Sequence, residues 1–169
     1  MKLIKRLLPW VLFGLALVAA VTFGLLWQQE RFKVNAQDGL RAQATEFIND
    51  LTSLSAETAE ADAEEIKQWA VGDFAEEAEV FYGDKAIDAV KEADASTEGT
   101  IESLYVQSLT DGEASLFAVI DYTVTNDGTA EPKTDTIRMS IEMIESDDGW
   151  KVNSVRVLES PGTALPSAG

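Results

Sequence analysis

The longest uncharged run of the chain, Leu7–Trp27, constrains the fold more than any other feature. As a helix its 21 residues would span about 31 Å, close to the thickness of a bilayer's hydrocarbon core. Three cations precede the run, and every carboxylate of the chain follows it. Because cations beside a span stay in the cytoplasm, we expect a cytoplasmic basic tip at 1–6, a transmembrane helix at 7–27 and an extracytoplasmic C-terminal domain.

A cleavable signal peptide is the alternative interpretation, since Val18-Ala19-Ala20 offers small residues to a peptidase. The apolar run continues to Trp27, however, and exceeds the roughly 7–15 residues of a signal-peptide core. The length therefore favours an uncleaved single-pass anchor. Both interpretations export the rest of the chain.

The exported part is strongly acidic. Without the three N-terminal cations its formal charge is −20, against −17 for the whole chain. Such a domain is repelled by nucleic acid and by anionic lipid headgroups. A partner with a basic face, a solvated surface that resists aggregation and adaptation to high salt each explain this composition.

The absence of Cys and His removes several kinds of chemistry. Thiol nucleophiles, imidazole bases, Ser-His-Asp triads and Cys/His zinc sites are excluded. The ordered oxygen spacing of a calcium loop is also missing, because Asp111-Gly112 and Asp147-Asp148-Gly149 are typical of turns. Carboxylate, lysine, tyrosine or hydroxyl chemistry and the binding of a hard cation remain possible, but no motif indicates them, so we assign no catalytic residue, no metal site and no cofactor.

Apolar spacings of three or four predict helices in the first half of the exported part. A juxtamembrane amphipathic helix is expected within 28–56, followed by a helix over Thr58–Val71 that stops at Gly72. Asp73 is predicted to cap a short helix that carries Phe74 and Ala78, and another helix covers 84–94.

The pattern changes to alternation after Gly99. Segments 100–109 and 115–125 flank Asp111-Gly112, a strong hairpin signal. Two further strands follow, and the first alternates Ile137, Met139, Ile141 and Met143 with polar residues. Helices followed by four strands predict one α+β domain at 57–159, with a curved four-stranded antiparallel meander. Residues 160–169 predict a disordered tail.

Five short motifs carry a resemblance to a known family. They are Gly72-Asp73-Phe74, 96–100 (STEGT), 121–126 (DYTVTN), 138–141 (RMSI) and 148–152 (DGWKV). In this order and after an anchor, they resemble the Mce-associated membrane proteins of actinobacteria, which have an NTF2-like, or cystatin-like, cone. The sequence departs from that pattern at Leu54-Ser55-Ala56, where many members carry an aromatic segment.

The resemblance implies a non-enzymatic accessory subunit in the cell envelope. Such proteins stabilise or assemble Mce complexes that import lipids or sterols, so the expected partners are the membrane, Mce-type transporter subunits or other membrane proteins, and a lipid or sterol ligand. An assembly component of another envelope machine, of the conjugation or secretion type, remains the alternative, as does a pocket lipid carrier or isomerase-like enzyme.

The enzyme alternative depends on Asp121 as a carboxylate base, with hydroxyls from Tyr82, Tyr105 and Tyr122. Against it, Asp121 and Tyr122 point to opposite faces of one strand. An Asp that is exposed or bonded to a neighbouring strand is the simpler interpretation.

Aromatic residues and sheet cations give two further hypotheses. Trp69, Phe74, Phe81, Phe117 and Trp150 either line a lipid pocket or belong to the core. The cations Arg138 and Lys151 either face solvent or pair across strands with groups such as Glu142.

Overall fold

The computed structural model describes residues 36–128 and 131–159. The basic tip, the transmembrane helix at 7–27 and the tail at 160–169 lie outside the described residues. No helix within the described ranges is long and apolar enough to cross a membrane. The chain divides after Gly39 into two units, and the fold described below is that of the unit beginning at Leu40.

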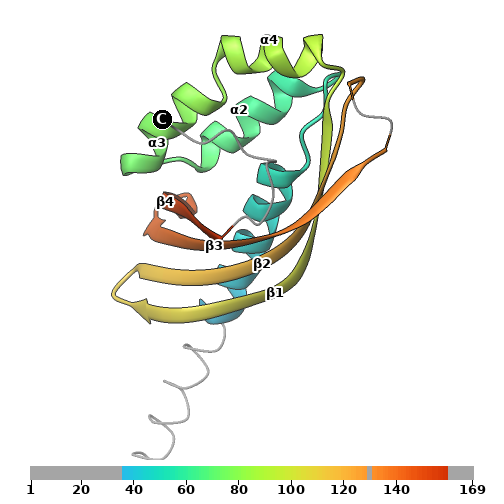
Figure 1. Ribbon diagram of the computed structural model, residues 1–169. Coiled ribbons are helices and arrows are strands. Elements are labelled where there is room, and N and C mark those ends of the chain that lie inside the picture. Colours follow the sequence, from blue (N-terminus) through green and yellow to red (C-terminus); the bar gives the residue numbers. More distant parts are fainter. Residues whose placement is uncertain (1–35, 129–130, 160–169) are drawn as a thin grey trace, which may run out of the picture. The chain divides into compact units, whose positions relative to one another are not determined.

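Helices precede strands along the chain, as the change of periodicity predicts (Figure 1). Residues 36–52 are helical. The elements that follow are α2 (Ala59–Trp69), α3 (Gly72–Phe81), α4 (Asp84–Glu92), β1 (Ser96–Thr110), β2 (Glu113–Thr125), β3 (Lys133–Ser146) and β4 (Gly149–Glu159). The α+β class is therefore confirmed.

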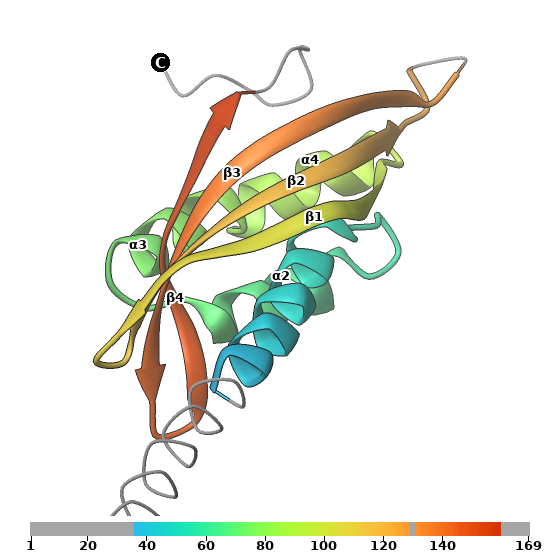
Figure 2. The same ribbon diagram turned by 90° about the horizontal axis from the view of Figure 1, so that it is seen from below.

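The four strands form one antiparallel sheet in the order β1-β2-β3-β4. Each strand pairs with the next along the chain, so the sheet is the predicted meander, and its strands are visibly curved (Figure 2). Register shifts interrupt the β1–β2 and β3–β4 ladders. Such β-bulges bend a strand and increase its twist.

The core lies between one face of the sheet and the helices. Strands β2 and β3 contribute every second residue to this core, namely those that the sequence pattern places on one face of each strand. Phe47 of helix 40–52 is fully buried at its centre, in edge-to-face contact with Trp69 and Phe74. The fully or nearly fully buried members from the helices and the sheet are Leu40, Ala44, Phe47, Ile48, Ile66, Phe74, Ala114, Leu116, Ala118, Ile120, Ile137, Met139, Ile141, Met143, Trp150 and Val152.

The hairpin turn between β1 and β2 confirms the Asp111-Gly112 signal. Both residues have positive φ, 50° and 80°. This combination matches the twist of a two-residue hairpin and favours Asp followed by Gly.

The predicted boundary between the second and third helices is wrong. Helix α2 ends at Trp69, and Ala70 is extended because residues 70–71 join the edge of the sheet. The Val71 N–H donates to the Val152 carbonyl oxygen at 2.8 Å. Gly72 therefore begins α3 instead of ending α2, and Asp73 lies in the first turn without capping it.

Candidate functional site

The structure does not assemble the isomerase-like set of residues. The Asp121 carboxylate accepts a hydrogen bond of 2.8 Å from the Thr136 hydroxyl on the neighbouring strand. Tyr122 points to the opposite face, and Tyr105 is 57% exposed. The simpler interpretation, an Asp bonded to a neighbouring strand, is confirmed.

Two tyrosines do meet inside the fold. Burial, together with the nearby Tyr122, raises the pKa of Tyr82 to about 12. Burial also raises the pKa of Tyr122, while a hydrogen bond with Thr97 opposes the rise. Both phenols are therefore protonated at neutral pH, and the carboxylate of Asp121 lies on the other side of the sheet. Tyr82 and Tyr122 therefore have a structural role, in which they pack at the edge of the hydrophobic core.

The five aromatic residues do not share a pocket. Phe74 and Trp150 are buried in the core, and Trp69 packs on Phe47 while its indole N–H donates to Asp50 at 2.7 Å. Phe81, in contrast, is 51% exposed. Phe117 lies on the face of the sheet opposite the core, so the five cannot surround one ligand.

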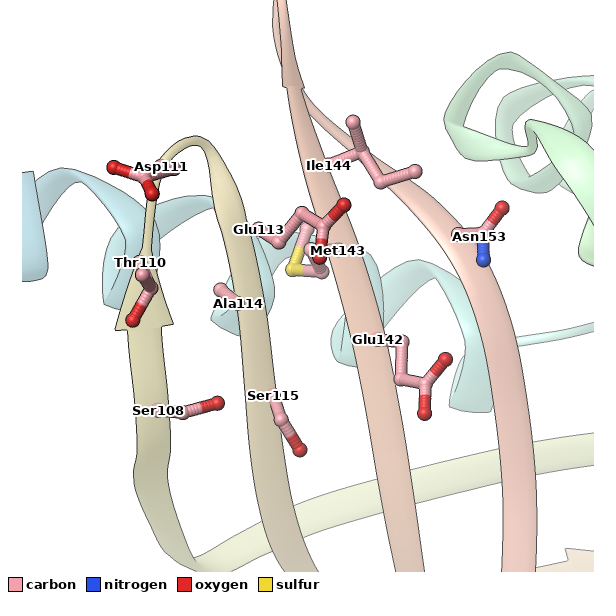
Figure 3. Close-up of a pocket in the computed structure, with 10 residues that line it drawn as sticks. All are labelled: Ser108, Thr110, Asp111, Glu113, Ala114, Ser115, Glu142, Met143, Ile144 and Asn153. Atoms are coloured by element: carbon pink, nitrogen blue, oxygen red, sulfur yellow. The ribbon is translucent and has the colours of Figure 1, made fainter.

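An open groove of about 550 Å³ lies where β1 and β2 turn, and it extends across β3 to β4 (Figure 3). Hydroxyl, carboxyl and amide groups dominate its lining, with Ile144 as an exposed apolar side chain. The lining residues are Ser108, Thr110, Asp111, Glu113, Ala114, Ser115, Glu142, Met143, Ile144 and Asn153.

The groove lacks the features of a catalytic or metal site. Its three carboxylates come from the turn, β2 and β3, and none belongs to a cluster of metal-ligating residues in the described part of the chain. Their residues are also exposed. An enclosed apolar pocket for a lipid would need the opposite character, with a deep and dry lining.

The two sheet cations have different environments. The Lys151 ammonium donates to the backbone oxygen of Gln68 at 3.0 Å, and so joins β4 to the end of α2. Arg138 is half-buried and stands opposite Val119 in the sheet. The structure therefore shows a link from Lys151 to a helix where the sequence suggested free or cross-strand cations.

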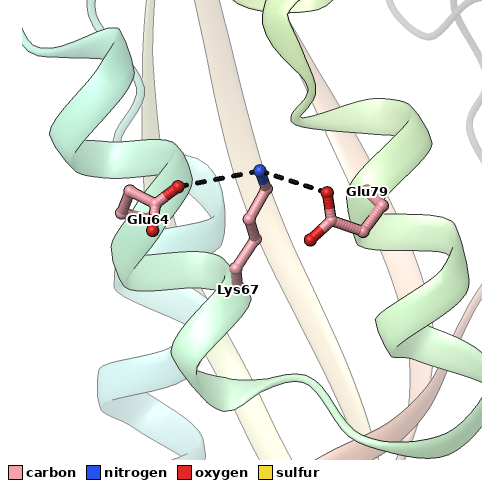
Figure 4. Close-up of polar contacts among 3 residues, drawn as sticks. All are labelled: Glu64, Lys67 and Glu79. Carbon is pink, nitrogen blue, oxygen red and sulfur yellow. Dashed lines mark ion pairs between the residues drawn. The ribbon is translucent and has the colours of Figure 1, made fainter.

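Ion pairs join the charged helices to one another. Lys67 of α2 lies 3.7 Å from Glu64 and 3.5 Å from Glu79 of α3 (Figure 4). Lys91 of α4 lies 2.6 Å from Glu60 of α2, and this lysine lowers the pKa of Glu60. Lys67 and Lys91 thus hold α3 and α4 to α2.

One surface feature escaped sequence reasoning. Val80 and Phe81, at the end of α3, are 75% and 51% exposed. Val80 lies on the same face of α3 as the carboxylates of Glu76 and Glu77, which precede it by four and three residues. An apolar residue on a charged helix face is a sign in the sequence that this residue is exposed. Periodicity alone, however, does not tell which apolar residues a fold leaves uncovered.

No protein-family model matches the chain, and no curated protein matches its sequence. The fold is similar to solved structures of secretion proteins. The VirB8 protein of Agrobacterium tumefaciens is 14% identical, with a TM-score of 0.61, over 78% of this chain and 96% of that chain. An IcmL-like type IV secretion system protein from Legionella pneumophila is 11% identical, with a TM-score of 0.60 and coverage of 75% and 94%.

A third similar structure is CagV of Helicobacter pylori, a VirB8 homolog of a type IV secretion system. It is 15% identical, with a TM-score of 0.57, over 71% of this chain and 96% of that chain. At such identities the likeness shows a shared fold alone, here the α+β arrangement of helices on a four-stranded antiparallel sheet.

The comparisons overturn the resemblance to Mce-associated proteins, and with it the Mce subunits and the lipid or sterol ligand. The motifs behind that resemblance serve the geometry of the fold. Gly72 has φ of 53° and packs against Asn153, and Gly149 has φ of 102° in the β3–β4 turn. Trp150 fills the core. These positions reflect the fold and do not identify a family.

Proposed function

We propose that this chain is a non-enzymatic, membrane-anchored assembly component of an envelope machine of the type IV secretion kind. The observation that carries the proposal is the extent of the structural likeness. The exported fold matches almost the full length of solved VirB8-like chains, 94–96% of each of the three. CagV and the IcmL-like protein belong to type IV secretion systems.

The chemistry of the surface supports a binding role over catalysis. The Asp121 carboxylate and the Tyr122 phenol, which the isomerase hypothesis would bring together, occupy opposite faces of β2. The groove in Figure 3 is open and polar.

The sequence supplies the topology of the proposal. In this proposal, residues 1–6 are the cytoplasmic tip and 7–27 the membrane span, and the exported domain that follows includes helix 40–52 in its core. The charge of −20 keeps the domain away from anionic headgroups while the anchor holds it near the bilayer. This arrangement suits a subunit that meets other membrane proteins beside the membrane.

Co-purification tests the proposal. A tagged full-length chain, extracted from its native cells in a gentle detergent, should recover other membrane subunits of one secretion machine. Deleting the gene should abolish transfer of that machine's substrate, and the intact chain should restore it. A chain that is recovered alone, and whose deletion leaves transfer intact, would contradict the assembly role.

The anchor needs its own variant. Replacing residues 7–27 with a cleavable signal exports the same domain without the span. We expect this form to fail to restore transfer, because the domain is no longer held beside its partners. Full restoration would show that the segment only directs export.

A further inference from the structure

The end of α3 presents two consecutive apolar side chains to solvent. Val80 is 75% exposed and Phe81 is 51% exposed, and we call these two residues the α3 knob. Large exposed apolar residues that stand together on a surface mark interaction sites, whereas scattered ones need no explanation. The partner that fits the knob follows from its surroundings.

The knob is held on a rigid base. Tyr82, the next residue, is largely buried in the core edge, and its N–H donates to the Ala78 carbonyl oxygen at 2.9 Å. Gly83 then permits a tight elbow, since a Cβ there would lie 2.6 Å from the Glu79 backbone oxygen. The backbone that carries Phe81 is therefore held in place, and a preorganised backbone lowers the entropic cost of binding.

The charges around the knob are predominantly negative. Residues 72–84 contain five carboxylates and no cation, and one exposed lysine, Lys85, follows at the start of α4. Glu76 and Glu77 are exposed on the face of α3 that carries Val80. The nearest lysine on α2, Lys67, already contacts Glu79 at 3.5 Å. The knob is an apolar centre with an acidic rim.

We propose that the α3 knob docks into an apolar pocket, rimmed by Lys or Arg, on another exported protein. The inference rests on the proposed function and specifies the surface by which it works. An anionic bilayer and a second copy of this chain would both bring negative charge against the acidic rim, at a cost in free energy. An apolar pocket with a basic rim complements both the apolar centre and the acidic rim of the knob. Buried aromatic side chains such as that of Phe81 often dominate the binding energy of an interface.

The experiment combines co-purification with cross-linking in native cells. A photoreactive phenylalanine analogue replaces Phe81 in the full-length chain. We expect a cross-link to one exported protein, at a segment rich in Lys or Arg. Glu76→Gln with Glu77→Gln should weaken that cross-link, because it removes the acidic rim. A cross-link only to lipid or to a second copy of this chain would overturn the proposal.

Matched variants separate the knob from the rest of the surface. Phe81→Ser should lower recovery of the cross-linked partner about tenfold. Tyr105→Ser removes a similarly exposed aromatic from β1 and should leave recovery unchanged. If the wild type and Phe81→Ser recover secretion subunits equally, the knob proposal is wrong and the proposed function stands. If the wild type recovers no secretion subunit, the proposed function itself is contradicted.

Discussion

The layer between helix 40–52 and the sheet differs sharply from the lobe formed by α2, α3 and α4. In the first, Phe47, Leu116 and Ile141 are fully buried. In the lobe, Ile66 and Phe74 reach the same core, but α4 has no buried residue and α3 leaves Val80 exposed. Apolar packing therefore stabilises the first region, whereas ion pairs through Lys67 and Lys91 supplement thin packing in the second. The comparison separates the part that keeps the domain folded from the part free to recognise a partner.

Phe47→Ala is expected to have the largest effect on stability, and it tests the difference between the two regions directly. The ring is fully buried, with its centroid 5.7 Å from that of Phe74, so its removal leaves a cavity in the core. We expect a loss of about 3–5 kcal/mol in the free energy of unfolding, measured by urea denaturation. Phe81→Ala, in the lobe, should cost less than about 0.5 kcal/mol. Equal losses at the two positions would contradict the division into two regions.

A second, smaller effect is expected where the lobe joins the sheet. Gly72→Ala places a methyl group against the Asn153 amide oxygen and forces alanine to adopt φ of 53°. The overlap and the left-handed backbone together should cost about 2–4 kcal/mol.

Adding Asn153→Ala to Gly72→Ala separates the two causes. The double variant removes the overlap and keeps the unfavourable backbone, so it should recover about half of the lost stability. Thermal unfolding of the four forms gives the coupling between the two sites. Strict additivity would show that the overlap contributes nothing.

What the sequence could predict follows the same division. The alternation of Ile137, Met139, Ile141 and Met143 is a local pattern, and it correctly identifies a half-buried strand. The extended conformation of Ala70 depends on pairing with Val152, which is far away along the chain, so no local pattern reveals it.

The candidate site shows the same limit. The Asp111-Gly112 turn was predicted, but the groove beside it also needs Asn153 from a register shift in β4, which sequence periodicity does not mark. The exposure of Val80 and Phe81 depends equally on which neighbours cover α3. Local structure was thus readable, whereas the surfaces that it forms were not.

The tyrosine pair offers a pH-dependent test at the border of the two regions. Burial raises the pKa of Tyr82 from 10.0 to about 12, so the folded state retains a proton that the unfolded state loses above pH 10. Stability should therefore fall as the pH rises from about 10 toward 12. Tyr82→Phe removes the ionisable group and should reduce this loss by about 1 kcal/mol at pH 11.

Urea unfolding at pH 8 and pH 11 measures the difference. Tyr122→Phe should act in the same direction, because burial raises the pKa of Tyr122 as well. If neither variant changes the alkaline loss, the two phenols do not link pH to folding.

The smallest effect is expected for the ion pairs that join the lobe. Lys67→Gln removes the contacts to Glu64 and Glu79, both of which have largely exposed side chains. The loss should be below about 1 kcal/mol in low salt and should vanish near 1 M NaCl, where screening acts over about 3 Å. Lys85→Gln is the matched control, since this exposed α4 lysine forms no ion pair among the described residues. A loss at Lys67 that survives high salt would mean that its methylene groups, packed between α2 and α3, hold the lobe together instead of its charge.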